Sequence, residues 1–244
     1  MKFYTKITSV ILFVCLLFSM TACGVSKPDF NSKETAPATT ENTEPATEAP
    51  TEPSTEEPTE EDEDKAFSAG TVEGSTYTND FVGISCALGD GWTIATKEQI
   101  AQQMGLVDVL ISDEDVIKQI ENSSTAMIFM ANKNDGTGSI NITAGDTTSY
   151  LTALVNQKTI VDTVVAQLPD ILTASGMEVI ECGTEDMMFC GEENYGIRSN
   201  LTFSGISIHQ RQIILVKGTY TITITVSTYS QDSTQALLDL FTAL

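Results

Sequence analysis

The sequence predicts an α+β fold for residues 77–244, with a central, mainly antiparallel sheet that carries helices on both faces, as in an α/β/α sandwich. In some segments apolar and polar residues alternate, which is typical of half-buried strands, and in others apolar residues recur at helical spacing. The region is long enough to bury one hydrophobic core. A signal peptide over 1–22 and a disordered linker over 23–76 are predicted to precede this domain.

The N-terminal segment has the composition of a secretory signal peptide. Lys2 and Lys6 form a positive start, residues 7–18 are apolar, and small residues stand just before Cys23. The apolar run is shorter than the ~20 residues that a membrane-spanning helix needs. The run "MTACG" resembles the lipobox of bacterial lipoprotein signal peptides, which implies cleavage before Cys23 and a diacylglycerol on its thiol. The alternative is a plain secretory signal that contains a cysteine.

The linker is rich in Thr, Glu and Pro, as in "ATEAPTEPSTEEPTEEDED". Such a segment has too few apolar residues to offset the entropy of ordering it. We therefore expect a disordered acidic tether between a lipid surface and the domain. In composition it resembles the stalks of lipoproteins from low-GC Gram-positive bacteria, which implies a location on the extracytoplasmic face of such a cell membrane.

The charge of the chain limits its partners. The sequence has 34 acids against 12 bases, a formal net charge of −22 and a pI near 4.1. Nucleic-acid binding needs a basic surface that displaces counterions, so we expect no nucleic-acid partner. Attachment to a membrane is predicted through the lipid on Cys23 and not through charge.

The elements of the domain are predicted from local patterns, in chain order. Strands open the fold over 77–88. A helix over 95–105 has a capping box at Thr96 and Gln99 and stops at Gly105, and a second helix, 112–123, has acids in its first turn. A hairpin over 126–146 turns near Asp135-Gly136. A long helix is expected within 147–172, then three strands, and finally an amphipathic helix over 232–244.

This order of elements resembles the PsbP-like family, which includes many bacterial lipoproteins. The resemblance rests on "YTNDFVGISCALGDGW" (77–92), the paired long strands and the final helix. It implies a sheet with helices on both faces and a role in binding or assembly. It brings no catalytic residue to this chain.

Two strands, 195–203 and 206–216, are separated by the predicted turn Ser204-Gly205. A tight turn places Arg198 opposite Arg211 and Asn200 opposite His209. Arg198 and Arg211 are the only arginines of the chain, and His209 is its only histidine. One interpretation is a small basic site for a carboxylate, a sulfate or an acidic partner. The other, which the abundance of acids favours, is that neighbours such as Glu192, Glu193 or Asp186 form salt bridges with the arginines. A second turn is predicted at Lys217-Gly218, which would place Ile224 beside Arg211.

Other site types find little support in the sequence. A single histidine makes Ser-His-Asp and Cys-His sites improbable, and we predict no metal site, no cofactor and no catalytic residue. Cys182 and Cys190 either form a disulfide or remain buried thiols. The predicted function is a monomeric, lipid-anchored protein whose domain binds a protein partner or a small, anionic ligand without catalysis. The alternatives are a carboxylate-based hydrolase or transferase and a structural surface protein without a ligand.

Overall fold

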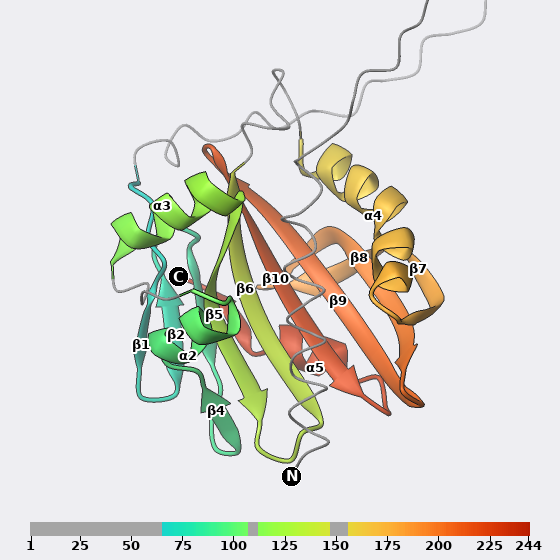
Figure 1. Ribbon diagram of the computed structural model, residues 1–244. Coiled ribbons are helices and arrows are strands. Elements are labelled where there is room, and N and C mark those ends of the chain that lie inside the picture. Colours follow the sequence, from blue (N-terminus) through green and yellow to red (C-terminus); the bar gives the residue numbers. More distant parts are fainter. Residues whose placement is uncertain (1–64, 107–111, 147–155) are drawn as a thin grey trace, which may run out of the picture.

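The computed structural model describes residues 65–106, 112–146 and 156–244 (Figure 1). The predicted signal peptide, the predicted lipidation site Cys23 and the linker up to residue 64 lie outside these residues. The folded part begins upstream of the predicted boundary at 77, because Phe67 and Ala69 are buried and a first strand is already formed over 71–73.

A seven-stranded antiparallel sheet forms the centre of the fold. Its strand order is β4-β5-β6-β10-β9-β8-β7. The strands are β4 (Trp92–Ile94), β5 (Thr125–Lys133), β6 (Gly138–Asp146), β7 (Glu178–Phe189), β8 (Glu192–Phe203), β9 (Ile206–Lys217) and β10 (Tyr220–Tyr229). The predicted register of β8 and β9 is confirmed, with Phe203 opposite Ile206 and Leu201 opposite Ile208.

A second antiparallel sheet has four strands in the order β1-β2-β3-β11. They are β1 (Thr71–Glu73), β2 (Thr76–Asn79), β3 (Ile84–Ala87) and β11 (Phe241–Ala243). Its apolar side chains share one core with the large sheet, where Tyr77 of β2 stacks on Phe129 of β5 with ring centroids 4.4 Å apart. The Tyr77 hydroxyl donates to the carbonyl of Ala69. The two sheets are therefore packed face to face.

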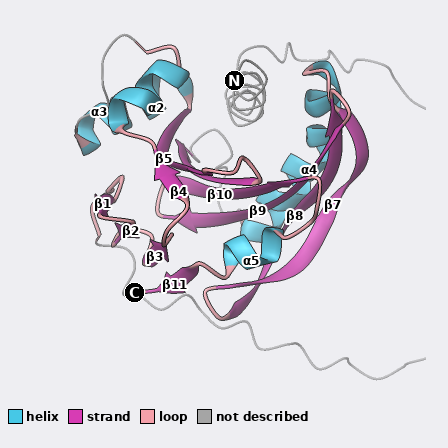
Figure 2. Ribbon diagram, turned by 90° about the horizontal axis from the view of Figure 1, so that it is seen from below, coloured by secondary structure: helices cyan, strands magenta, loops and turns pink. Residues whose placement is uncertain are grey.

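The described part of the chain contains four helices: α2 (Lys97–Gln103), α3 (Asp113–Ser123), α4 (Gln157–Ala174) and α5 (Thr234–Leu238). Both predicted helix starts are confirmed, since Thr96 and Gln99 form a capping box on α2 and Ser112 caps α3. Asn156 caps α4, and the part of the predicted long helix that precedes it lies outside the described residues. Figure 2 shows α2 and α4 on one side of the large sheet, with α5 and the small sheet on the other.

The predicted fold class is wrong. About 49% of the described residues are in strands and 25% in helices, and the protein is mostly β, with two sheets in place of an α/β/α sandwich. One face of the large sheet packs on the small sheet, through residues such as Ile142, Ile213 and Ile224. Hydrophobic periodicity shows that a sheet face is buried, but it does not say whether a helix or another sheet covers it. The short opening strands form this second sheet and do not belong to a single central one.

Two element predictions also need correction. The region 178–229 has four strands and not three, because β7 is itself a 12-residue strand. The C-terminal helix α5 is only five residues long, and the chain then forms strand β11, in which Phe241 pairs with Cys86 of β3. Pairing satisfies backbone groups along the edge of β3, which outweighs the helical pattern of the local sequence.

Candidate functional site

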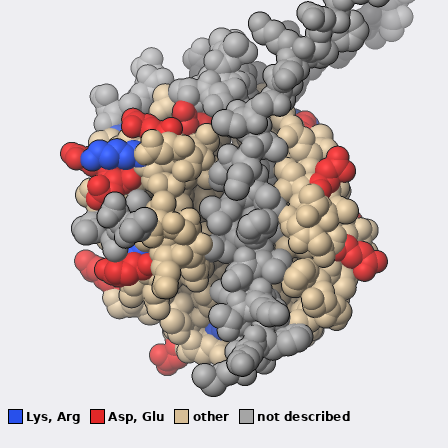
Figure 3. All heavy atoms as spheres, in the orientation of Figure 1, with Lys and Arg blue, Asp and Glu red and all other residues tan. Residues whose placement is uncertain are grey.

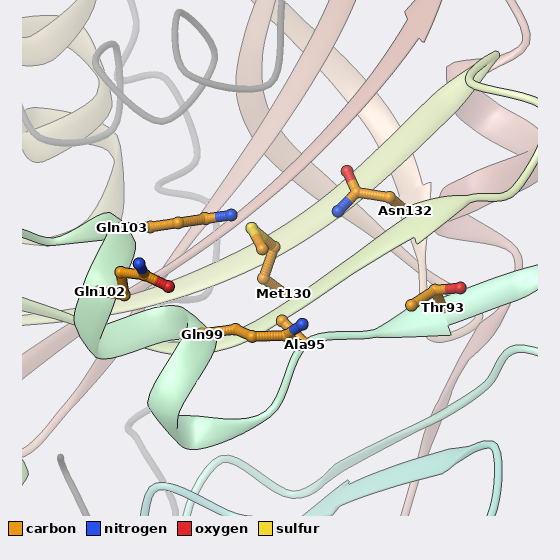
Figure 4. Close-up of a pocket in the computed structure, with 7 residues that line it drawn as sticks. All are labelled: Thr93, Ala95, Gln99, Gln102, Gln103, Met130 and Asn132. Carbon is orange, nitrogen blue, oxygen red and sulfur yellow. The ribbon is translucent and has the colours of Figure 1, made fainter. Parts of the chain in front are cut away.

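A pocket of about 250 Å³ lies between α2 and the adjoining end of the large sheet (Figure 4). Side chains from α2, β5 and the β4 segment converge on it. Its lining residues are Thr93, Ala95, Gln99, Gln102, Gln103, Met130 and Asn132. All seven are uncharged, so the pocket is a neutral site on a strongly acidic chain.

The pocket forms because α2 has one apolar side and one amide side. Ile100 packs on Met127 and Met130 of β5, which fixes the helix against the sheet. Gln99 is held by the capping box, where its Oε1 accepts from the Thr96 amide at 2.8 Å. The buried Oε1 of Gln103 accepts no hydrogen bond from any residue in the described parts of the chain. A buried acceptor without a donor is costly, so this atom favours a ligand that donates a hydrogen bond.

Arg211, one of the sequence-predicted site residues, is held firmly by its neighbours. Its Nε donates to Glu185 Oε2 at 2.9 Å, another guanidinium nitrogen donates to Glu185 Oε1 at 3.3 Å, and a third donates to Thr234 Oγ1 at 2.6 Å. Asp232 lies 3.8 Å away. The hydrogen bonds to Glu185 raise the pKa of the guanidinium further above its ordinary value, against the effect of burial. Arg211 thus has little donor capacity left for a ligand.

Arg198 lies directly opposite Arg211, as predicted, and is bound more loosely. Its guanidinium is 3.9 Å from Glu181 and 3.8 Å from Asp232, beyond hydrogen-bond distance. Its buried Nε has no acceptor among the described residues. Arg198 is the member of this cluster with unused hydrogen-bonding capacity.

His209 and Asn200 complete the cluster. His209 Nδ1 lies 2.8 Å from Asn200 Oδ1, and Asn200 Nδ2 donates to Glu181 Oε2 at 2.6 Å. The structure therefore brings all four predicted residues together on β8 and β9. The acids beside them are Glu181, Glu185 and Asp232, not the predicted Glu192, Glu193 or Asp186. Two arginines facing three carboxylates leave this cluster with no excess of positive charge.

The two cysteines that were candidates for a disulfide are both free thiols. Cys182 lies within β7, and Cys190 follows the end of the same strand. Seven residues of chain separate them, a span of roughly 25 Å in an extended strand, and a disulfide requires Cα atoms within about 7 Å. The bridged alternative does not fit this arrangement, because the turn begins only at Cys190.

The remaining ionisable groups of the described residues are not arranged as a metal site. Within the described ranges, no group of three or more His, Cys, Asp or Glu side chains is placed to hold a metal. None of the described helices is long and apolar enough to cross a membrane. On the face shown in Figure 3, acidic side chains dominate the charged groups at both flanks. Among the described residues, the pocket beside α2 is therefore taken as the candidate site.

Sequence patterns that could have indicated this pocket are present but weak. Three glutamines lie within seven residues of α2, in "KEQIAQQ". In the sequence of α2 alone they indicate an ordinary solvent-facing side of the helix, because glutamine is a good helix former and is usually exposed. Only the packing of α2 against β5 shows that these amides line a cavity.

Comparisons with known proteins give distant matches only. No protein-family model matches the chain, and no curated protein matches it significantly. A solved structure from Bacteroides thetaiotaomicron VPI-5482 is 10% identical over 71% of this chain and 49% of its own, with a TM-score of 0.34. The chain thus spans about half the length of that protein. LpqN of Mycobacterium tuberculosis, which is involved in cell envelope biogenesis, is 10% identical over 65% of this chain and 82% of its own, also with a TM-score of 0.34. The resemblance to the PsbP-like family stays a prediction.

Proposed function

We propose that this protein is a lipid-anchored, extracytoplasmic binding protein that holds an uncharged polar ligand in the pocket beside α2 and performs no chemistry on it. The unpartnered Oε1 of Gln103 in an uncharged lining carries the proposal. Binding sites are commonly concave and mostly apolar, with a few polar groups that orient the ligand. Met130 and Ala95 supply apolar surface here, and the amides supply the orienting groups.

The pocket is preferred to the arginine cluster on grounds of charge. An anion at Arg198 would lie beside Glu181 and Asp232, whose negative charges already balance the positive charge of the arginine. Each added negative charge would meet repulsion unless a carboxylate moved away or was protonated. A neutral ligand in the pocket meets no such repulsion, because no ionisable side chain lines it.

A thermal-shift screen of the full chain against a mixed panel of neutral and anionic small molecules tests this proposal. We expect the stabilising compounds to be neutral hydrogen-bond donors, because a ligand that binds only the native state raises the melting temperature. Their effect should disappear in Gln103→Leu and persist in Arg198→Ala. Anionic hits that are lost in Arg198→Ala and kept in Gln103→Leu would move the binding site to the arginine cluster.

The anchor is tested separately in cells. Growth with a clickable fatty-acid analogue should label the wild-type protein. Cys23→Ser should abolish the label, because the predicted lipobox places the acyl chains on Cys23. Cys86→Ser is the matched control and should keep the label. An unlabelled wild-type protein, made and exported normally, would contradict the lipid anchor and leave the pocket proposal intact.

A further inference from the structure

Strand β7 is a long, open edge of the large sheet. It has 12 residues and ends the strand order, whereas β4 at the opposite edge has only 3. No described strand pairs with the outer side of β7, and Figure 2 shows it as the outermost strand. Proteins usually keep such edges short or covered, because their unpaired backbone groups can pair with another chain. An open edge of this length is therefore a surface to which an extended peptide can add.

The backbone groups that point outward can be assigned from the pairing of β7 with β8. The register is unbroken over 181–189, so alternate residues turn their N–H and C=O groups away from β8. Met188 belongs to this outward set, because its carbonyl accepts a hydrogen bond from Gln235 Nε2 of α5 at 2.9 Å. Steps of two along the strand give the other outward residues, which are Cys182, Thr184 and Asp186.

The outward groups form a regular and well-supported row. Apart from the Met188 carbonyl, none of them is hydrogen-bonded to another described residue. Strand β8 holds one side of β7 and α4 packs on one of its faces, so the row is already in place before a partner arrives. A bulge at Ile180 ends the regular edge upstream, and Gln235 ends it downstream. The row between them spans roughly 27 Å, which is longer than a typical strand of about six residues.

The side chains of β7 select a basic partner. The strand has no basic residue and four acidic ones, Glu178, Glu181, Glu185 and Asp186. Glu178 and Asp186 are exposed and form no ion pair with any described residue, so their charges are available to a partner. Charge complementarity of this kind steers the encounter and excludes partners of the wrong sign.

Apolar side chains flank the same edge. Ile180 is 62% exposed and Met188 50%. They are two of the four large apolar side chains that are exposed among the described residues. Because they lie near the two ends of the regular edge, a fitting segment carries apolar residues toward its own ends.

A second copy of this chain fits the edge poorly. Two β7 strands paired side by side would set the acids of one copy against those of the other. Like charges in opposed positions destabilise a sheet. The net charge of −22 on each copy adds to this repulsion. The charge of β7 therefore favours a different, basic protein over a dimer.

We propose that the outer edge of β7 binds an extended, basic segment of a partner protein by strand addition. The outward backbone groups of β7 supply the hydrogen bonds, and Glu178 and Asp186 attract the basic side chains. Ile180 and Met188 contact apolar residues near the ends of the segment. This site is separate from the pocket beside α2, so Gln103→Leu should leave it unchanged.

Fluorescence anisotropy of the full chain with labelled nonapeptides tests the inference. The basic probe alternates valine and lysine, with valine at both ends. One comparison peptide has glutamate in place of each lysine. The other is the basic probe with N-methyl groups on two successive central residues, which removes a backbone donor from whichever edge faces β7. We expect the basic probe to bind with a Kd of about 0.1 mM or tighter, and both comparison peptides at least about tenfold more weakly.

Variants of the chain locate the binding edge. Thr184→Pro removes an outward N–H and should weaken binding of the basic probe at least about tenfold. Glu178→Gln/Asp186→Asn should weaken it about threefold or more, the effect of losing two exposed ion pairs. Glu114→Gln/Glu121→Gln, on α3, is the matched control. It removes the same charge from another surface and should bind as the wild type does.

The melting temperature checks the assignment of the outward groups. Proline is tolerated in an edge strand where the N–H that it replaces faces solvent, so Thr184→Pro should melt within about 5 °C of the wild type. A variant that melts far lower would show that this N–H is bonded within the sheet, and would overturn the assignment.

Three results with the unaltered chain would also overturn the inference, whether or not Thr184→Pro folds. The basic probe does not bind. The N-methylated peptide binds as tightly as the basic probe, which reduces the interaction to charge attraction. The chain forms a dimer in analytical ultracentrifugation that the basic probe does not dissociate, which makes a second copy the occupant of the edge.

Discussion

Arg198 and Arg211 lie directly opposite one another on β8 and β9, yet only Arg211 is hydrogen-bonded to a carboxylate. Its Nε is 2.9 Å from Glu185 Oε2, whereas the nearest carboxylate oxygen to Arg198 is 3.8 Å away. Like charges in opposed positions destabilise a sheet unless they are neutralised. Here Asp232 lies within 4 Å of both guanidinium groups, so one carboxylate offsets the repulsion between them.

The difference between the two arginines predicts unequal effects on stability. Arg211→Ala should lower the free energy of unfolding by about 2 kcal/mol, because it leaves a half-buried Glu185 without its partner. Arg198→Ala should lower it by less than about 1 kcal/mol, as is usual for long, partly exposed ion pairs. Urea unfolding of both variants provides the measurement. Equal losses would contradict the assignment of Arg211 as the residue that holds the cluster together.

The lowered pKa of Asp232 predicts how the free energy of unfolding changes in acid. Burial works to raise its pKa, but hydrogen bonds from Thr234 and the charges of Arg211 and His209 outweigh burial and hold the pKa below its usual value. A carboxyl with a lowered folded-state pKa stabilises the protein above its unfolded pKa of about 3.9, and this contribution is lost as the pH falls through the folded-state value.

The stability difference between wild type and Asp232→Asn should therefore be largest near neutral pH and should shrink below about pH 4. Urea midpoints of both proteins across this range measure it. Asp170→Asn, on α4 and remote from the cluster, controls for the change in net charge. A difference that stays constant down to about pH 2 would show that ionised Asp232 has no role in stability.

The close packing around Gly196 predicts that the sheet tolerates no side chain at this position. A Cβ at this position would lie 2.5 Å from the carbonyl oxygen of Gln212 and 3.0 Å from Met187 Cε. Gly196→Ala should lower the free energy of unfolding by roughly 3 kcal/mol, because the backbone must shift to admit the methyl group. Gly183→Ala on the neighbouring strand β7 meets no atom within 4 Å and should change it by less than about 0.5 kcal/mol. Similar losses in both variants would contradict the close packing at Gly196.

The raised pKa values of the buried thiols predict that the native protein is alkylated slowly. Burial raises the pKa of Cys86 to about 12 and that of Cys190 to about 11, in the second case with help from the charge of Glu192. At about pH 8 the thiolate fraction of Cys190 is then roughly two orders of magnitude below that of an ordinary cysteine. Iodoacetamide labelling followed by peptide mass spectrometry should show Cys190 reacting slowly, and Cys86 reacting only on unfolding.

Urea without reductant provides the control for these thiols. Cys86, Cys182 and Cys190 should all become labelled there, because all three are free in the structure. Resistance of Cys182 and Cys190 to labelling until reductant is added would show a disulfide between them and contradict the extended course of β7.

Local patterns predicted those parts of the fold that depend on neighbouring residues. The capping box at Thr96 and Gln99 and the hairpin turn at Asp135-Gly136 were correct, because caps and tight turns are fixed by a few adjacent residues. The turn between β9 and β10 was predicted at Lys217-Gly218, which would pair Ile224 with Arg211. In the structure Ile224 pairs with Ile213. A shift of two residues keeps every side chain on its predicted face, so the pattern could not reveal it.

The burial of polar side chains on β9 and β10 shows the limit of such patterns. Strand β10 alternates Thr and Ser with Ile and Val, which predicts one polar and one apolar face. The polar residues Thr225 and Ser227 are nevertheless buried, like Gln210 and Gln212 beside them. Alternation gives the two faces of a strand, but exposure depends on what packs over each face.

The sequence by itself determined the acidic character of the chain, the starts of α2 and α3 and the pairing that brings Arg198 beside Arg211. These properties follow from composition and from contacts between residues that are close along the chain. Only the tertiary structure decided that a second sheet covers the large one, that Glu185 neutralises Arg211, and that amides of α2 face Asn132 across a pocket. Each of these depends on segments far apart in sequence, whose meeting is set by how the layers bury their apolar faces together.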